Sequence, residues 1–77
     1  MTKTVFTNEY QGLIHWLKAE RIEAGLTIRG LAEKLGVVHS YVGRIETFER
    51  RLDVWEYMEY CKALNLDPKK GIDILSQ

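Results

Sequence analysis

The sequence predicts an all-α protein of five short helices. Apolar residues recur at helical spacing along almost the whole chain, whereas the alternation typical of a half-buried strand is nearly absent. There is no Gly-, Ser- or Pro-rich linker, internal repeat or low-complexity stretch. The 77 residues suffice for one domain with one core. We therefore expect a single domain over 1–77, comprising an N-terminal arm (1–7), four core helices (8–66) and a C-terminal helix (67–77).

The first helix is expected to begin at Asn8, with Gln11 as a capping-box partner three residues later. It should run to about Ala24, before Gly25 ends it. On a helical wheel, one arc holds the residues expected to face the core: Tyr10, Leu13, Leu17, Arg21 and Ala24.

The second and third helices are separated by a very short turn. Thr27 is the expected N-cap of a helix over 28–35, which Gly36 ends, and a third helix is expected over about 39–47. A turn of about three to four residues that contains glycine, between two short helices, is typical of a helix-turn-helix. Ala32 and Gly36 are small where we expect the two backbones to approach each other.

The last two helices have clear start signals. Asp53 is the expected N-cap of a fourth helix, with Glu56 at the capping-box position. Asp67 followed by Pro68 predicts the start of a short fifth helix. The inner face of the fourth helix is expected to consist of Val54, Tyr57, Met58, Cys61 and Leu64.

The predicted third helix has a polar side without a carboxylate. Its inward arc is expected to consist of Val38, Val42 and Ile45. The opposite arc holds His39, Ser40, Gly43, Arg44 and Thr47, with Tyr41 and Glu46 at its borders. Such a side suits the negative potential of the DNA major groove, where arginine to guanine is the commonest specific contact. A glycine inside a helix costs about 1 kcal/mol relative to alanine. Close approach to a phosphate or base would explain Gly43, and a merely tolerated glycine is the equal alternative.

The formal net charge is zero, which argues against a protein that coats nucleic acid without sequence preference. The charge is unevenly distributed, since residues 27–52 hold five basic and three acidic groups. The predicted helix-turn-helix is therefore slightly basic.

Four stretches follow one another, without insertion or deletion, as they do in one known family. They are "RIEAGLT" (21–27), "LAEKLGV" (31–37), "SYVGRIE" (40–46) and "ERRLDVWEYMEYCKALNLDP" (49–68). On these stretches, residues 13–66 resemble the Cro/phage-repressor (Xre-type) helix-turn-helix family. The resemblance implies a compact five-helix, lambda-repressor-like DNA-binding domain with the motif at the second and third helices. It implies a cytoplasmic transcription regulator, most simply a repressor of phage or prophage type or an autoregulator.

The resemblance also implies which residues contact double-stranded DNA. Base contacts are implied for His39, Ser40 and Arg44, and phosphate contacts for Thr27, Arg29, Arg50 and Arg51. From their places on the third helix, we also expect Gly43 to contact a base and Tyr41 and Thr47 to contact phosphates. Ordinary solvated charges are the alternative for the last two arginines, and packing at the domain edge is the alternative for the tyrosine.

Two charged residues need partners inside the domain. Glu46 lies in the last turn of the third helix, where a carboxylate opposes the helix macrodipole. Arg21 lies on the core-facing arc of the first helix. In the family these two positions form a partly buried ion pair, and the resemblance implies the same structural pair here.

Three positions depart from the family pattern. Many relatives have Asn-Gly after the glutamate, whereas this chain has Thr47-Phe48. A phenylalanine with positive φ would be strained, so we expect the end of the third helix to differ and Phe48 to pack on a neighbour. Ile28 replaces a polar residue that often donates to phosphate. Val38 replaces the usual hydroxyl N-cap, so that the third helix should begin less firmly.

A homodimer on a palindromic operator is expected, because one recognition helix reads only a few base pairs. The favoured interface is the fifth helix with part of the fourth, through Trp55, Ile72, Ile74 and Leu75. The alternative is that these side chains only cover a small core. Two other functions stay open: an antitoxin that also binds a protein partner, and an interaction module that has lost DNA binding.

Catalysis finds no support in the sequence. His15 and His39 lie on different predicted helices, and Cys61 lies on an inward face. There is no Gly-rich phosphate loop and no metal-ligand spacing. We therefore expect no enzyme activity, catalytic residue, metal, cofactor or small-molecule substrate. No apolar run approaches the ~20 residues of a membrane span, and no signal peptide is recognisable, which agrees with a cytoplasmic protein.

Overall fold

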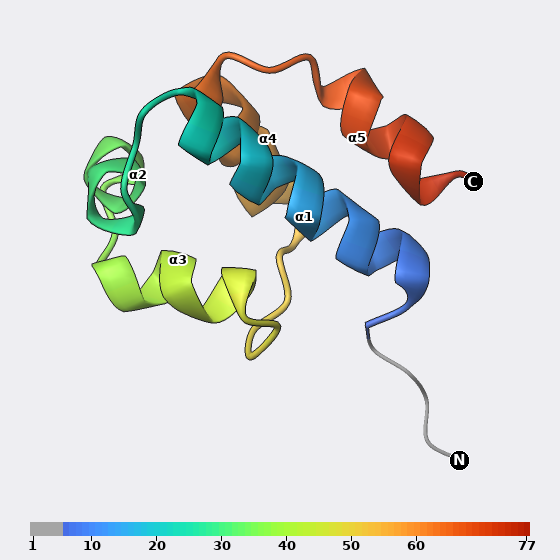
Figure 1. Cartoon of the computed structure of the whole chain (residues 1–77), viewed down its shortest axis with the longest axis horizontal. Helices are drawn as coiled ribbons and strands as arrows, with labels where there is room; N and C mark the ends of the chain where they lie inside the picture. The colour runs from blue at the N-terminus through green and yellow to red at the C-terminus, as the bar shows by residue number, and fades with distance from the viewer. Residues whose placement is uncertain (1–5) are drawn as a thin grey trace.

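Five helices follow one another along the part of the chain that the computed structural model describes, residues 6–77. They are α1 (Asn8–Glu23), α2 (Ile28–Leu35), α3 (His39–Glu46), α4 (Val54–Leu64) and α5 (Pro68–Leu75). α1 crosses the middle of the molecule, with α2 and α3 packed together at one end and α5 alongside α1 at the other (Figure 1). The all-α prediction is confirmed. Most of the expected N-terminal arm lies outside the described residues.

Local chemistry fixes the starts of three helices as predicted. Thr27 Oγ1 accepts a hydrogen bond from the first turn of α2 at 2.9 Å. Asp53 and Glu56 form a complete capping box at the start of α4. Asp67 caps α5. Pro68 occupies the first turn, where a backbone N–H would have no partner within the helix, so that its absence costs no hydrogen bond.

The predicted cap of α1 is wrong by one residue. Thr7 is the N-cap, and its hydroxyl accepts from Tyr10 N at 3.2 Å. Gln11 does not complete a capping box with Asn8, because its side-chain amide donates to the carbonyl oxygen of Phe6 at 2.9 Å. Threonine and asparagine both cap well, so two adjacent candidates could not be ranked from sequence.

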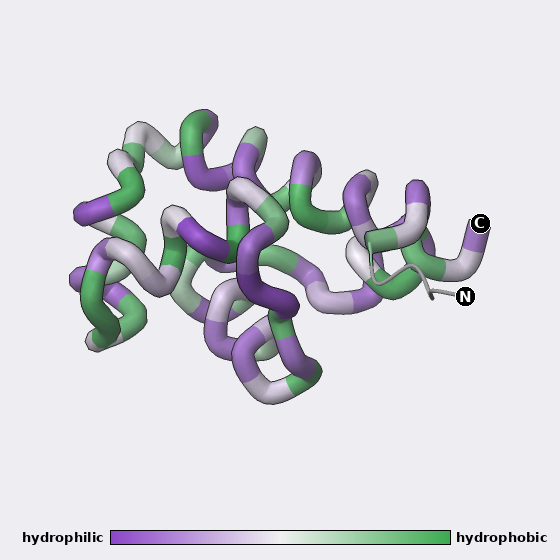
Figure 2. Tube along the Cα trace, turned by 90° about the horizontal axis from the view of Figure 1, so that it is seen from below, coloured by the Kyte–Doolittle hydropathy of each residue, from purple (hydrophilic) through white to green (hydrophobic). Residues whose placement is uncertain are grey.

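The core lies where the first four helices meet. Its buried apolar residues are Leu13, Ile14, Leu17, Leu31, Ala32, Val42, Ile45, Tyr57, Tyr60, Cys61 and Leu64. Figure 2 shows the corresponding alternation of hydrophobic and hydrophilic segments along the helices. Ile14 and Tyr60, each 1% exposed, are absent from the predicted inward arcs. Both arcs are therefore rotated relative to the prediction, because α1 and α4 each contact several helices.

Four residues expected to face the core are exposed instead: Ala24, Val38, Val54 and Met58. Ala24 follows the last helical residue of α1, and Val38 precedes the first of α3, so that neither belongs to its helical wheel. Val54 opens α4 and is 80% exposed. Met58 lies one turn later on the same flank of α4 and is 37% exposed.

Glycine is required at two positions, for different structural reasons. Gly36 ends α2 with φ +74°, and a Cβ there would meet no atom within 4 Å, so that backbone conformation rather than the expected close approach requires it. Gly71 permits close packing of α5. A Cβ at this position would overlap the Tyr57 hydroxyl and lie 2.8 Å from Leu13 Cδ1. The same hydroxyl donates to the carbonyl oxygen of Pro68, which ties α5 to α4.

Candidate nucleic-acid interface

α3 presents one side to solvent and buries the other. Val42 and Ile45 are fully buried, as predicted. The opposite side carries the exposed residues His39, Ser40, Arg44 and Thr47 and the half-buried Gly43. No carboxylate of α3 belongs to this exposed side, because its one acidic residue, Glu46, turns towards α1. The helix therefore offers donors to an approaching polyanion.

A buried ion pair holds α3 against α1. Arg21 Nε donates to Glu46 Oε2 at 2.7 Å, and Arg21 Nη2 donates to Glu46 Oε1 at 3.0 Å. The two side chains are only 9% and 5% exposed. Arg21 Nη1 also donates to the carbonyl oxygen of Leu26 at 2.7 Å. One guanidinium thus joins α1, α3 and the turn that leads into α2.

The side chain of Thr47 is occupied within the chain. Its hydroxyl donates to the Gly43 carbonyl oxygen at 2.9 Å and lies 2.8 Å from Glu49 Oε2. Because a hydroxyl has a single hydrogen, a phosphate contact by Thr47 would have to replace its hydrogen bond to Gly43 or to Glu49. At Gly43, a Cβ would meet no atom of the protein within 4 Å. Packing inside the described part of the chain therefore gives no reason for glycine there.

Phe48 follows α3 in the left-handed region, at φ +64°. The expectation of a different ending is therefore wrong, because Phe48 keeps the left-handed position although that conformation is strained for a residue with a Cβ. The ring packs edge-on against Phe6, Tyr10 and His15, with centroid distances of 5.9, 6.4 and 5.7 Å. These aromatic contacts offset the strain and join the end of α3 to the start of α1.

Arg50, Tyr41 and Glu56 form a cluster between α3 and α4, which the sequence did not predict. Two hydrogen bonds, of 2.9 and 2.6 Å, join the Arg50 guanidinium to the Glu56 carboxylate. The guanidinium also lies 4.5 Å from the centroid of the Tyr41 ring. The hydrogen bonds from Arg50 lower the pKa of Glu56 to about 2. Burial, followed by a hydrogen bond to Glu56, raises the pKa of Tyr41 to about 12.

Arg50 and Arg51 therefore differ in how free their guanidinium groups are to contact another molecule. The side chain of Arg50 is 38% exposed but already paired. Arg51 is exposed, and it forms no ion pair within residues 6–77. At the other end of α3, the N-cap residue Thr27, Arg29 from α2 and His39 from α3 line one shallow hollow of about 430 Å³. The structure thus brings these three candidate contacts together and places the two loop arginines elsewhere.

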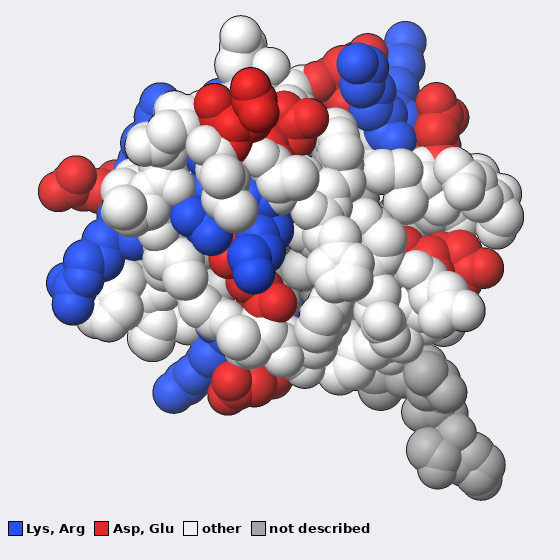
Figure 3. Space-filling view, viewed as in Figure 1, with Lys and Arg blue, Asp and Glu red and all other residues white. Residues whose placement is uncertain are grey.

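The surface charge around α2 and α3 is mixed. Lys and Arg side chains project at the edge where these helices lie, and Asp and Glu are interspersed with them (Figure 3). This face carries no large patch of a single sign. Such a surface favours binding through a few specific contacts over charge-driven coating of DNA.

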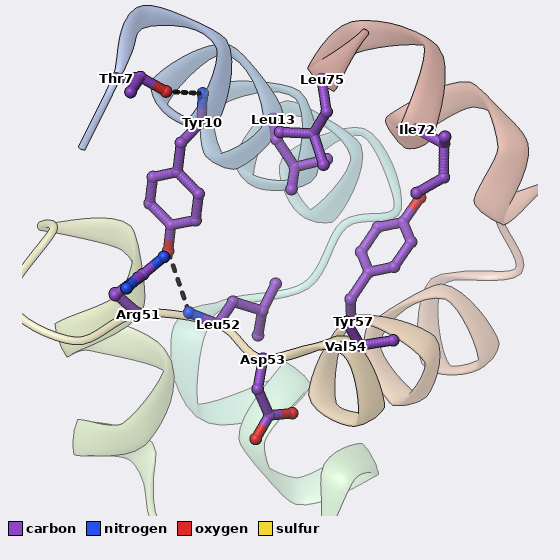
Figure 4. A pocket seen from close by; sticks show the side chains of 10 residues that line it. All are labelled: Thr7, Tyr10, Leu13, Arg51, Leu52, Asp53, Val54, Tyr57, Ile72 and Leu75. Carbon is purple, nitrogen blue, oxygen red and sulfur yellow. Dashed lines mark hydrogen bonds between the residues drawn. The ribbon is translucent and has the colours of Figure 1, made fainter. Parts of the chain in front are cut away.

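A second hollow, of about 390 Å³, lies between α1, α4 and α5 (Figure 4). Its wall includes Leu13, Leu52, Ile72 and Leu75, and it is mostly apolar. At its edge the Tyr10 hydroxyl accepts from Leu52 N at 3.0 Å. No residue of α3 lines this hollow, so it is separate from the polar side of that helix.

Within residues 6–77, no cluster of three or more His, Cys, Asp or Glu side chains is placed to hold a metal ion. In the same part of the chain, no helix has the length and apolarity that a bilayer crossing requires.

Residues 15–70 match a family model described as a helix-turn-helix domain. The structure is similar to an XRE-family like protein from Pseudomonas syringae pv. tomato, with 40% identity and a TM-score of 0.81 over 88% of this chain and 83% of that one. The chain belongs to the Xre-type helix-turn-helix family. This Xre-type membership supports a DNA-binding transcription regulator.

The Xre-type fold is also shared with the clp gene regulator ClgR from C. glutamicum. The TM-score is 0.77, with 21% identity over 91% of each chain, a likeness that concerns the fold alone. Among curated proteins, none matches the sequence.

Proposed function

We propose that this Xre-type protein is a sequence-specific transcription regulator that inserts α3 into the major groove of double-stranded DNA. One observation carries the proposal. The exposed side of α3 has donors and no carboxylate of the helix itself, with Glu49 beside Thr47 after its end, while the other side is anchored by Val42, Ile45 and the Arg21–Glu46 pair. A recognition helix needs this combination, because base contacts require side chains held at a fixed angle.

Base contacts are assigned to the exposed side of α3. Arg44 can donate to two acceptors of a guanine, and His39 and Ser40 can donate to base edges nearer the start of the helix. Gly43 lets a phosphate or base approach the helix backbone, since no protein atom fills the space beside it. Such contacts carry the sequence preference.

Phosphate contacts are assigned to both ends of the motif. Thr27 and Arg29 lie beside the hollow at the start of α2, where backbone N–H groups also point outward. Arg51 is available in the loop after α3. For Arg50 and Tyr41 we propose phosphate contacts that keep the Arg50–Glu56 hydrogen bonds and the stacking of Arg50 on the Tyr41 ring. For Thr47 we propose a contact that replaces one of its hydrogen bonds within the chain. The main effect of all three residues is to position the loop.

A homodimer is proposed to bind a palindromic site. Ile72 is 50% exposed, Leu75 39% and Trp55 70%, whereas Ile74 is half-buried against α1. The first two border the apolar hollow beside α5. Pairing through this surface would leave α3 free on each copy. Two recognition helices about 34 Å apart would then reach successive turns of one duplex face, and the bound dimer would act as a repressor by occluding the site.

Selection from random double-stranded DNA tests this function. Full-length protein should enrich one palindromic sequence with half-sites spaced by about one helical turn. Affinity for this sequence should exceed that for unrelated duplex by at least about 1,000-fold at physiological salt. Recovery of no common sequence, with equal affinity for all duplexes, would contradict it.

A further inference from the structure

Val38 is an apolar side chain left in solvent at the start of α3. It is 69% exposed and lies outside the core. It is the N-cap residue, with an extended backbone at φ −73° and ψ 152°, and its side chain makes no capping hydrogen bond. A serine or threonine here would stabilise the start of the helix. Neither burial nor helix capping therefore accounts for valine at this position.

The place of Val38 in the motif suggests its contact. In the docking geometry of helix-turn-helix proteins, the N-terminal residues of the recognition helix reach the base edges. Val38 directly precedes His39 and Ser40, the first two proposed base contacts. The C5-methyl of thymine is the apolar group that bases present in the major groove, and apolar side chains recognise it by contact.

We propose that Val38 is a specificity-determining residue that contacts the C5-methyl of one thymine in each half-site. The inference rests on the proposed function, because it requires α3 to lie in the major groove. The valine methyl groups and the thymine methyl exclude water from each other, and cytosine or a purine at the same position offers no equivalent apolar group.

Replacement of thymine by deoxyuridine isolates this contact, because uracil pairs as thymine does but lacks the C5-methyl. Each thymine of the selected half-site is replaced in turn, and Kd of the full chain is measured by fluorescence anisotropy. Burial of one methyl group corresponds to about a fourfold change in affinity. We expect one position at which uracil weakens binding by about fourfold per half-site.

Variants at position 38 assign that effect to the side chain. Val38→Thr and Val38→Ser both supply a capping hydroxyl, and they differ from each other by one methyl group. The threonine variant should still distinguish thymine from uracil, whereas the serine variant should bind both equally. Ile22→Ala is the control, because Ile22 is an exposed apolar residue of α1, 58% exposed, and its removal should leave the fourfold difference unchanged.

A scan in which no thymine is sensitive overturns the inference and leaves the proposed function standing. A sensitive thymine whose effect persists in Val38→Ser also overturns it, because another residue would then make the contact. Failure of the unmodified protein to bind any selected duplex overturns both the inference and the proposed function.

Discussion

Phe48 shows how one residue sets the exit of the recognition helix. Its left-handed backbone, at φ +64°, costs an L-residue about 1–2 kcal/mol. The strain is retained because the ring packs with Phe6, Tyr10 and His15, which brings the end of α3 next to the start of α1. The sequence showed that a glycine is missing here, but the left-handed backbone of Phe48 could not be predicted from it, because the aromatic neighbours that hold the ring depend on tertiary contacts far along the chain.

Substitutions at Phe48 separate the strain from the packing. Phe48→Ala should lower the free energy of unfolding by about 2 kcal/mol, because it loses the ring contacts and keeps the strain. Phe48→Gly should be more stable than the alanine variant by about 1 kcal/mol, since glycine adopts positive φ freely. Urea denaturation measures both. At Lys70, inside α5, the order should reverse, with alanine about 1 kcal/mol more stable than glycine. If alanine were more stable than glycine at position 48 as well as at position 70, Phe48 would not be strained.

Residue-level predictions succeeded where the cause is local. Thr27, Asp53 and Asp67 each cap through their own side chain to a backbone group two or three residues later, so a short stretch of sequence suffices. The predictions that Val38 and Val54 face the core were wrong because both residues stand at helix starts. A helical wheel does not describe an N-cap, and it does not say whether a neighbouring helix extends far enough to cover a first turn.

At the scale of the helices, the angle of α3 depends on its tie to α1. The bidentate Arg21–Glu46 pair is nearly buried. Removing one partner alone should destabilise the protein most, because the other charge is then buried without a partner. Glu46→Gln should lower the free energy of unfolding by about 3 kcal/mol and weaken operator binding. Denaturation and anisotropy measure the two effects.

An apolar replacement of both partners provides the control. The double variant Arg21→Met, Glu46→Leu should be less destabilised than the sum of the two single variants, because it leaves no charge unpaired. Full stability and full operator affinity in Glu46→Gln would show that the pair does not position α3.

The link between α3 and α4 predicts a pH dependence. Glu56 titrates at about 2 in the folded protein, against an ordinary value of 4.5, because Arg50 stabilises its charged form. The stabilisation is therefore complete above about pH 4.5 and is lost as the pH falls from there towards 2. Glu56→Gln should reduce the free energy of unfolding by about 1 kcal/mol at pH 6.

The difference between the two proteins should shrink steadily from pH 4.5 and be small at pH 2, where the carboxyl group of the unmodified protein is about half protonated in the folded state and protonated in the unfolded state. Denaturant titrations at a series of pH values measure it. Glutamine retains a side-chain acceptor at this position, which limits the loss of capping. An equal difference at pH 6 and pH 2 would mean that charge plays no part in this link.

For the whole molecule, the arrangement of α5 predicts how two copies pair. Ile72→Asp should shift the protein to monomer in sedimentation and weaken binding to the palindrome at least tenfold. Binding to a single half-site should change little. Stability should also change little, because Ile72 is 50% exposed in the monomer.

Lys70→Asp is the matched control for the dimer. It places the same side chain two residues away, on the opposite side of α5, and should leave the oligomeric state unchanged. Unchanged sedimentation of Ile72→Asp would exclude this surface as the dimer interface.

The fold class and the helix-turn-helix followed from the sequence, because helical spacing, caps and the three-residue turn act locally. The inward positions of Ile14 and Tyr60, and the cluster of Arg50 with Glu56, did not. These depend on which helices lie against α1 and α4, and sequence spacing gives the faces of a helix without giving its neighbours.

The central claim is that the exposed side of α3 reads DNA sequence, and Arg44→Ala tests it most directly. Its affinity should be measured for the selected operator and for duplexes altered at each position, beside Lys70→Ala, which removes one positive charge from α5. We expect Arg44→Ala to weaken operator binding by about 1–3 kcal/mol and to relax the preference at one base pair, and the control to change neither. Equal weakening by Arg44→Ala on every duplex, or no weakening at all, would contradict the account.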